Sequence, residues 1–268
     1  MRRGTPSRTK ALLTLPLLAI AGAGLAQAQE ASAPAPRRLQ LLTDFDIHVS
    51  VEHVGSDDPK FVWDADYGAD LDLLDYGLGR VTFLAEYEAI LGEELRRFDP
   101  NQGNFTLDIS SSVRTDAAEV AFVFHHLSRH LSDRRKTFPI DWNMVGVHAV
   151  RPVTIGSTWL ELRGRALWNV KRSFVDYRAD YGAGVQVRHR VDSHVSVIGA
   201  GELTLMPVDR TVLDRPTQVG ARLEAGVRLD GPGAATELFV AYERRIDAGP
   251  FDMRPRTWGL VGLRLLSR

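Results

Sequence analysis

A period-two alternation of apolar and polar residues runs along most of this chain and limits its fold more than any other feature. In the first repeat, Phe45, Ile47, Val49 and Val51 alternate with polar residues. This alternation is typical of a β-strand whose two faces meet different surroundings. The same pattern predicts strands at 45–54, 66–76, 80–92, 104–115, 118–129, 142–153, 157–170, 179–191, 194–207, 216–230, 234–246 and 256–267. The sequence therefore predicts an all-β fold.

The connections between the predicted strands alternate in length. Short turns follow every second strand, beginning with the turn at 77–79, and longer polar loops follow the others. Outer-membrane barrels have this asymmetry, with tight periplasmic turns and longer external loops. A membrane-crossing strand needs about 9–11 residues, and the predicted strands meet this requirement. We therefore predict a twelve-stranded antiparallel transmembrane β-barrel over residues 39–268, with its termini in the periplasm.

The N-terminus predicts export. Basic residues precede an apolar stretch at 11–25 that ends in Ala26-Gln27-Ala28, which is typical of a cleaved signal peptide over residues 1–28. Residues 29–38 are rich in Pro and Ala and are expected to form a flexible leader. We therefore expect the protein in the bacterial outer membrane, with the membrane insertion machinery and membrane lipid as partners.

Composition excludes several function classes. The chain has 33 Lys and Arg against 34 Asp and Glu, so it lacks the basic excess of a nucleic-acid binder. It has no cysteine, which excludes disulfides, thiolate-bound metals and a thiol nucleophile. Charged residues occupy the polar face of most predicted strands, and in a barrel of this size they are expected to pair across the lumen.

Polar residues interrupt the apolar face of the predicted strand 118–129. Phe122 and Phe124 mark one face as the lipid side, and His126 and Ser128 continue the same row toward the external end. Polar groups at membrane depth are costly and are candidates for function. A histidine beside a serine is also the minimal base and nucleophile for acyl transfer.

A third group is needed to orient the imidazole ring. On the next predicted strand, Asn143 lies on the lipid face with Val145 and Val147, and we expect it near Ser128. Asp141 has the same parity and is the alternative orienting group. The sequence thus predicts a lipid esterase site of His126, Ser128 and Asn143 at the outer rim.

The segment His126-Leu127-Ser128, followed by Trp142-Asn143, resembles the outer membrane phospholipase A family. This resemblance implies a twelve-stranded barrel in which His126 is the base, Ser128 the nucleophile and Asn143 the residue that orients the ring. It also implies calcium as a cofactor and regulation by homodimer formation. Arg129 and His130 follow Ser128 where that family has Asn-Gly.

The longer string from His126 to Asp133 also resembles the His-x-Ser-Ser-His-Leu-Gly-Asp signature of an uncharacterised group of envelope barrel proteins. That resemblance does not imply any activity for this chain.

Other functions remain open from the residues alone. Ser132, Asp133 and His130 form a candidate metal-binding set in the following loop. The polar residues at the rim also fit an interfacial patch without catalytic activity. The alternative to an enzyme is a non-enzymatic outer-membrane barrel, either a narrow pore or a structural or adhesion protein.

Overall fold

The computed structural model describes residues 39–132, 135 and 138–267. The predicted signal peptide and leader, residues 1–38, lie outside the described residues. No helix within these ranges is long and apolar enough to cross a membrane.

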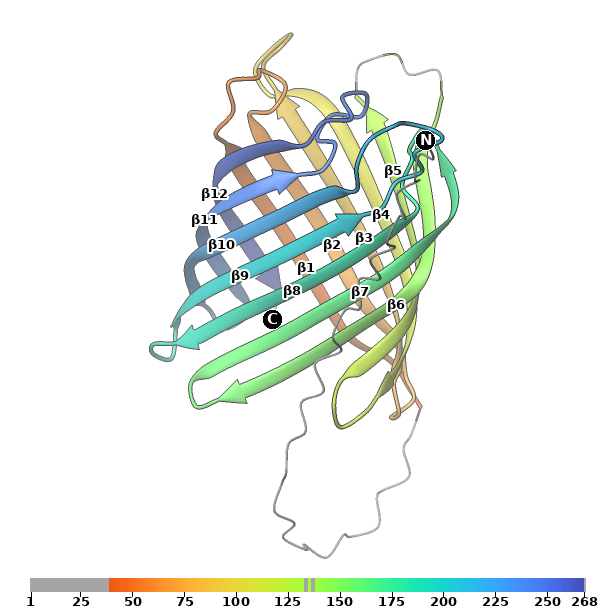
Figure 1. Ribbon diagram of the computed structural model, residues 1–268. Helices are drawn as coiled ribbons and strands as arrows, with labels where there is room; N and C mark the ends of the chain where they lie inside the picture. Colours follow the sequence, from red (N-terminus) through yellow and green to blue (C-terminus); the bar gives the residue numbers. More distant parts are fainter. Residues whose placement is uncertain (1–38, 133–134, 136–137, 268) are drawn as a thin grey trace, which may run out of the picture. The chain divides into compact units, whose positions relative to one another are not determined.

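Twelve strands form one closed antiparallel barrel in which every strand pairs with its neighbours in sequence (Figure 1). β1 and β12 close the barrel by pairing His48 to Val54 with Leu266 to Leu260. The strands are β1 (Gln40–Val54), β2 (Trp63–Asp75), β3 (Arg80–Gly92), β4 (Asp99–Arg114), β5 (Glu119–Leu131), β6 (Ile140–Ile155), β7 (Thr158–Ser173), β8 (Ala179–Arg190), β9 (Val195–Met206), β10 (Gln218–Asp230), β11 (Ala234–Arg245) and β12 (Arg256–Ser267). The predicted all-β, twelve-stranded antiparallel barrel is confirmed.

The two ends of the barrel differ as the sequence predicted. Short turns at 76–79, 115–118, 156–157, 191–194 and 231–233 lie at one end, and the longer loops lie at the other (Figure 1). We refer to the end with the longer loops as the external end. Gly77 and Gly156 have φ angles of 77° and 58°, which L side chains rarely adopt, so glycine suits these tight turns.

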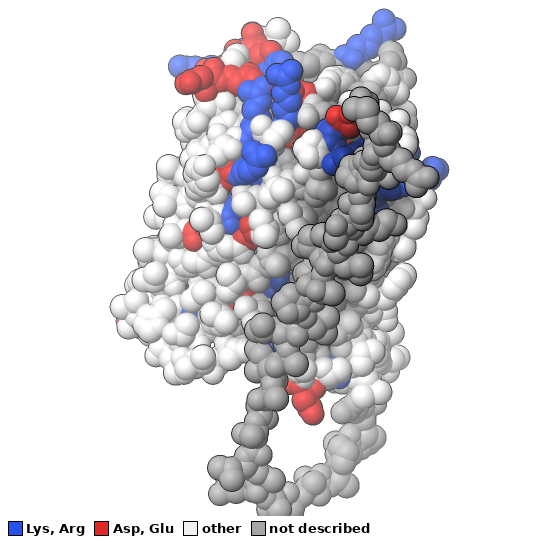
Figure 2. Space-filling view, in the orientation of Figure 1, with Lys and Arg blue, Asp and Glu red and all other residues white. Residues whose placement is uncertain are grey.

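The outer face of the barrel is apolar. Exposed side chains on this face include Phe45, Phe122, Val147 and Leu223. Figure 2 shows one side of the barrel, where charged side chains gather at the external end and are sparse across the middle of the wall. An apolar band that surrounds a closed barrel is the surface that a lipid bilayer covers.

Two clusters of apolar side chains pack inside the barrel. One apolar cluster includes Val123, Trp142, Met144 and Leu167, and a second includes Phe61, Phe239, Trp258 and Leu260. The members of both clusters are at most 9% exposed.

Ion pairs cross the lumen beside these clusters. Arg245 of β11 binds Asp64 of β2 at 2.5 Å and Glu88 of β3 at 2.9 Å. Arg222 of β10 binds Glu52 of β1 at 2.8 Å. These pairs join strands that are three or four positions apart around the barrel, and they pair charges that would be costly to bury alone. They agree with the expectation that lumen charges pair with one another.

Candidate hydrolase site

The two faces of β5 carry adjacent histidines in opposite surroundings. His125 points into the lumen, where its Nδ1 lies 2.6 Å from Oδ1 of Asp108. His126 lies on the outer face, between Phe124, which is 38% exposed, and Ser128. Successive side chains of a strand point to opposite faces, so the period-two pattern alone separates the two rings.

His126 contacts the asparagine that the sequence analysis placed in its site. The β5–β6 register sets His126 directly opposite Asn143, and His126 Nδ1 lies 2.9 Å from Asn143 Oδ1. An amide oxygen only accepts hydrogen bonds, so Nδ1 carries the proton in this pair. In the neutral ring, the lone pair is then on Nε2, the atom that a general base uses.

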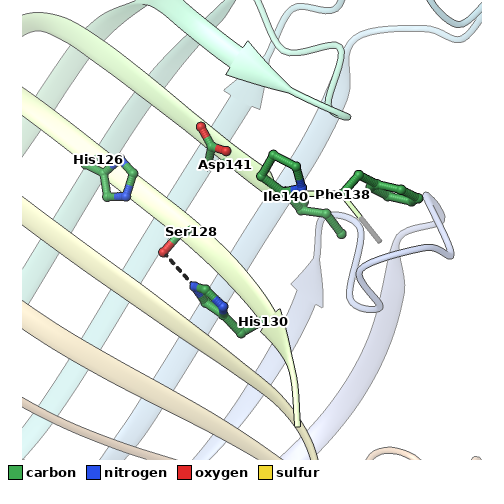
Figure 3. Close-up of a pocket in the computed structure, with 7 residues that line it drawn as sticks. His126, Ser128, His130, Phe138, Ile140 and Asp141 are labelled. Atoms are coloured by element: carbon green, nitrogen blue, oxygen red, sulfur yellow. Dashed lines mark hydrogen bonds between the residues drawn. The ribbon is translucent and has the colours of Figure 1, made fainter. Parts of the chain in front are cut away.

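Ser128 lies one pair further toward the external end. Its partner on β6 is Asp141, the predicted alternative orienting group, and Asn143 belongs to the neighbouring pair. Its hydroxyl lies 3.3 Å from Nε2 of His130, the next residue on the same face (Figure 3). Among the described side chains, no hydrogen bond joins Ser128 to His126.

Ser128 has an imidazole on each side along the strand. Residues two apart on a strand have Cα atoms about 6.5–7 Å apart, so His126 and His130 are equally near along the backbone. Rotation of Ser128 about χ1 redirects its Oγ between them. His130 is one of the predicted metal ligands, and its parity alone also places it beside Ser128.

An open pocket surrounds these groups. It is lined by His126, Ser128, His130, Phe138, Pro139, Ile140 and Asp141 (Figure 3). Its polar residues come from β5 and from the start of β6. The segment that enters β6 supplies the apolar side chains. A polar reacting group beside an apolar wall suits an ester with an attached acyl chain.

Aromatic residues lie beside Ser128 on the outer face. Phe105 of β4 pairs directly with Ser128, and its ring lies 4.6 Å from that of Tyr87. The His130 ring packs edge-on against Phe105 at 5.3 Å. Gly103 lies opposite His130, and a Cβ there would come within 2.5 Å of the Tyr87 hydroxyl. Aromatic girdles mark the interface between lipid and water, so these rings support a position for Ser128 near the lipid head groups.

The external loops hold the apolar wall of the pocket. The ring of Phe138 stacks on Phe174 at 4.5 Å, and Phe251 packs edge-on against Phe138 at 5.8 Å. The three phenylalanines come from three different connections: β5–β6, β7–β8 and β11–β12.

Buried charges fix the loops behind these rings. Arg215 binds Asp176 at 2.5 Å and Asp247 at 2.8 Å, and both carboxylates are at most 3% exposed. The Tyr177 hydroxyl donates to Asp247 at 2.5 Å. Burial, together with the nearby Asp247 carboxylate, raises the pKa of Tyr177, so the phenol keeps its proton as a donor. Arg215 therefore ties the β7–β8, β9–β10 and β11–β12 loops together.

The candidate metal set in the β5–β6 loop is only partly placed. His130 contacts Ser128 and Phe105, and the backbone N–H of Ser132 donates to the carbonyl of Asn101 at 3.3 Å. Asp133 lies outside the described residues. A metal role for these residues stays a prediction.

The pocket offers few ligands for calcium. Calcium takes 6–8 oxygen ligands, usually several of them carboxylates. Asp141 is the single carboxylate among the described residues that line the pocket. These residues do not form a calcium site by themselves, and we derive no step from calcium.

A second polar cluster, which was not predicted from the sequence, lies on the lumen face. His48, Asp66 and Glu86 of three adjacent strands each bring one ligand atom within 4.8 Å of the others. His48 Nε2 already pairs with Asp66 at 3.3 Å, and Ser50 donates to the same carboxylate at 2.6 Å. This cluster faces the lumen and is separate from the outer rim.

Comparison with known proteins extends the description of the fold. Neither a family model nor a curated protein sequence matches the chain. Among solved structures, the COG4313 outer membrane channel from Pseudomonas putida F1 is similar, with a TM-score of 0.53 and 12% identity over 89% of this chain and 99% of that chain. LpxR from Salmonella typhimurium is similar with a TM-score of 0.51 and 9% identity over 83% of this chain and 99% of that chain. The closed barrel, its apolar outer face and these likenesses identify the fold as that of a bacterial outer-membrane β-barrel.

Proposed function

We propose that this barrel is an outer-membrane lipid acyl hydrolase of the phospholipase A type. Ser128 is its nucleophile, His126 its general base and Asn143 the residue that orients the base. The observation that carries the proposal is the 2.9 Å contact between His126 Nδ1 and Asn143 Oδ1 on the outer face, with Ser128 next in the same row. This arrangement turns the basic nitrogen away from Asn143 and makes it available to a hydroxyl.

The reaction follows from the chemistry of these groups. His126 Nε2 takes the proton as Ser128 Oγ attacks the ester carbonyl carbon of a lipid. The tetrahedral intermediate expels the lipid alcohol, which receives the proton from His126. Water then attacks the acyl-enzyme with His126 again as base, the bond to Ser128 Oγ breaks, and Ser128 Oγ takes the proton back from His126 as the fatty acid leaves. In the resting protein, Ser128 is held by His130, so the hydroxyl rotates to His126 when the substrate binds.

The surroundings of Ser128 suit a lipid substrate. The hydroxyl lies beside Phe105, an exposed aromatic ring on the lipid-facing wall. The apolar side of the pocket, formed by the exposed Phe138 and Pro139, can receive an acyl chain. An ester at the head-group level of the outer leaflet would reach Ser128 laterally from the membrane.

The lumen gives less support to a pore. The clusters around Trp142 and Trp258, together with the ion pairs of Arg222 and Arg245, narrow the space that a diffusion path needs. No observation in the described residues favours adhesion over hydrolysis.

The test is release of fatty acid from phospholipid in mixed micelles by the refolded full barrel, with and without calcium. We expect wild-type protein to release fatty acid and Ser128→Ala to lose at least about 10³-fold of this activity. The matched control is Ser111→Ala, because Ser111 is exposed on the same outer face near the opposite end of the barrel. All three proteins should keep the mobility shift on heating that a folded barrel shows.

Absence of ester release by folded wild-type protein would overturn the proposal. Equal loss of activity in the two serine variants would do the same, because it would separate the activity from Ser128. His130→Ala distinguishes the two imidazoles: it should leave most of the activity if His126 is the base.

A further inference from the structure

A β-bulge in β7 changes which side chain stands beside the proposed site. Met144 of β6 pairs with Asn169, but the next pair joins Asn143 to Lys171, so Val170 has no partner on β6. A bulge adds one residue to one strand and re-aims the side chains that follow it. Asn169 lies opposite the buried, lumen-facing Met144, so regular alternation would turn Lys171 inward. The bulge instead sets it opposite the outward-facing Asn143.

The result is one row of polar residues across three strands. His126, Asn143 and Lys171 stand opposite one another on β5, β6 and β7. Neighbouring strands lie about 4.8 Å apart, so the Cα of Lys171 is about 10 Å from that of His126. The four-carbon side chain of Lys171 can bring its ammonium group close enough to Ser128 for a single phospholipid to contact both.

Lys171 is exposed and has no ion pair or hydrogen bond with any described residue. The nearest cations at this rim differ, because Arg172 binds Asp209 at 2.8 Å and Arg178 lies 3.9 Å from the same carboxylate. Asp141 is the acidic group on the adjacent pair of β6, yet it forms no ion pair within 4.0 Å with Lys171. The lysine is therefore the available cation beside His126 and Asn143.

We infer that Lys171 binds the phosphate of the lipid whose ester Ser128 attacks, and so selects phosphate-bearing lipids over uncharged ones. This inference rests on the proposed function. In a glycerophospholipid, the phosphate and the esters are attached to the same glycerol, so one molecule can reach both the ammonium group and the serine. A lysine ammonium is a point charge with three donors, which suits a phosphate diester. Lys171 is thus a specificity-determining residue, and it takes no part in bond making.

The test compares two substrates with the same acyl chains in mixed micelles, phosphatidylethanolamine and diacylglycerol. We expect Lys171→Met to lower kcat/KM for the phospholipid about tenfold, mainly through KM, and to leave diacylglycerol hydrolysis unchanged. Lys171→Arg should restore most of the preference. The matched control is Arg210→Met, which removes one exposed cation from the β9–β10 loop at the same end of the barrel. An equal fall for both substrates, or no change for either, would overturn the inference while leaving the proposed function intact.

A binding arm separates this inference from the hydrolase proposal. Ser128→Ala protein, with and without Lys171→Met, is examined by native mass spectrometry for retention of an ether-linked phospholipid and, separately, of inorganic phosphate. Weaker retention of the lipid alone in the double variant supports the inference, even if wild-type protein hydrolyses neither substrate. Equal retention of lipid by both proteins, or a Lys171-dependent site for inorganic phosphate alone, would overturn it.

Discussion

The two faces of the β5–β6 hairpin each carry a histidine, but the two histidines have different surroundings. On the lumen face, His125 binds Asp108, and Trp142 and Met144 pack in a closed core. On the outer face, His126 binds Asn143 beside an open pocket. The histidine with a carboxylate inside the barrel joins two adjacent strands, whereas the histidine with an amide at the rim has room for another molecule. Solvent and lipid access, more than residue type, distinguishes a structural histidine from a candidate base.

The largest expected effect on activity and stability comes from replacing each histidine in turn with alanine. His126→Ala should lower ester release about 10³-fold and leave the free energy of unfolding nearly unchanged, because it removes the proposed base from an open site. His125→Ala should do the opposite, costing about 2 kcal/mol of stability as Asp108 loses its partner. Fatty-acid release and urea unfolding in lipid vesicles measure the two effects. If both variants lose activity and stability together, the comparison between the faces fails.

Packing should also differ between the faces. Trp142 is 3% exposed inside the barrel, and Trp142→Ala should lower the free energy of unfolding by about 3–5 kcal/mol. Phe124 is 38% exposed on the outer face, and Phe124→Ala should cost clearly less, because lipid fills the space that the ring leaves. Urea titration of both variants in the same vesicles compares them. Equal costs would show that the lumen near Trp142 is looser than this packing implies.

Asn143 tests the orientation of the base. Asn143→Ala should lower kcat about tenfold, the value of one lost hydrogen bond to the His126 ring. Asn143→Asp keeps an acceptor for Nδ1 and should recover most of the rate. The control is Val147→Ala on the same face of β6, which should leave kcat unchanged. A similar loss in the Asp variant would show that Asn143 acts through something other than this hydrogen bond.

The smallest effect concerns the loops above the hairpin. Hydrogen bonds from the side chain and backbone of Thr211, followed by one from Arg172, lower the pKa of Asp209 to about 2. A lowered pKa in the folded state adds stability above the ordinary value, about 4, and this stability is lost as the pH falls toward 2. Limited pepsin digestion should therefore cut the 207–217 loop faster as the pH is lowered across this interval. Asp209→Asn should show a flatter dependence, and an unchanged slope would contradict this assignment.

Much of the fold followed from the sequence because strand parity is a local property. The predicted strands at 80–92 and 256–267 match β3 and β12 residue for residue. The outward direction of His126 followed from Phe122 and Phe124 in the same way. Register is different, because the path of the β5–β6 loop sets it. Counting residues placed Asn143 near Ser128, whereas the pairing of the strands puts Asn143 opposite His126 and Asp141 opposite Ser128.

The bulge at Val170 of β7 shows where strand parity no longer predicts the direction of a side chain. Trp168 and Val170 are both exposed, and a strict period of two from them turns Lys171 toward the lumen. One unpaired residue at Val170 reverses that assignment. Nothing local in the sequence signals the extra residue, because it arises from how β7 fits against β6. Strand parity places His130 on the same face as Ser128, but its contact with Ser128 depends on side-chain rotamers.

The packed cluster behind the hairpin gives the proposed chemistry separate supply routes. Trp142, Met144 and Leu167 close the interior directly behind the hairpin. Hydrolytic water therefore has to descend from the external medium past the loops, while the ester arrives sideways from the leaflet. Each turnover would then depend on water and the ester reaching the pocket together at the loop near Phe138. The rate of hydrolysis should therefore respond to the fluidity and curvature of the surrounding leaflet.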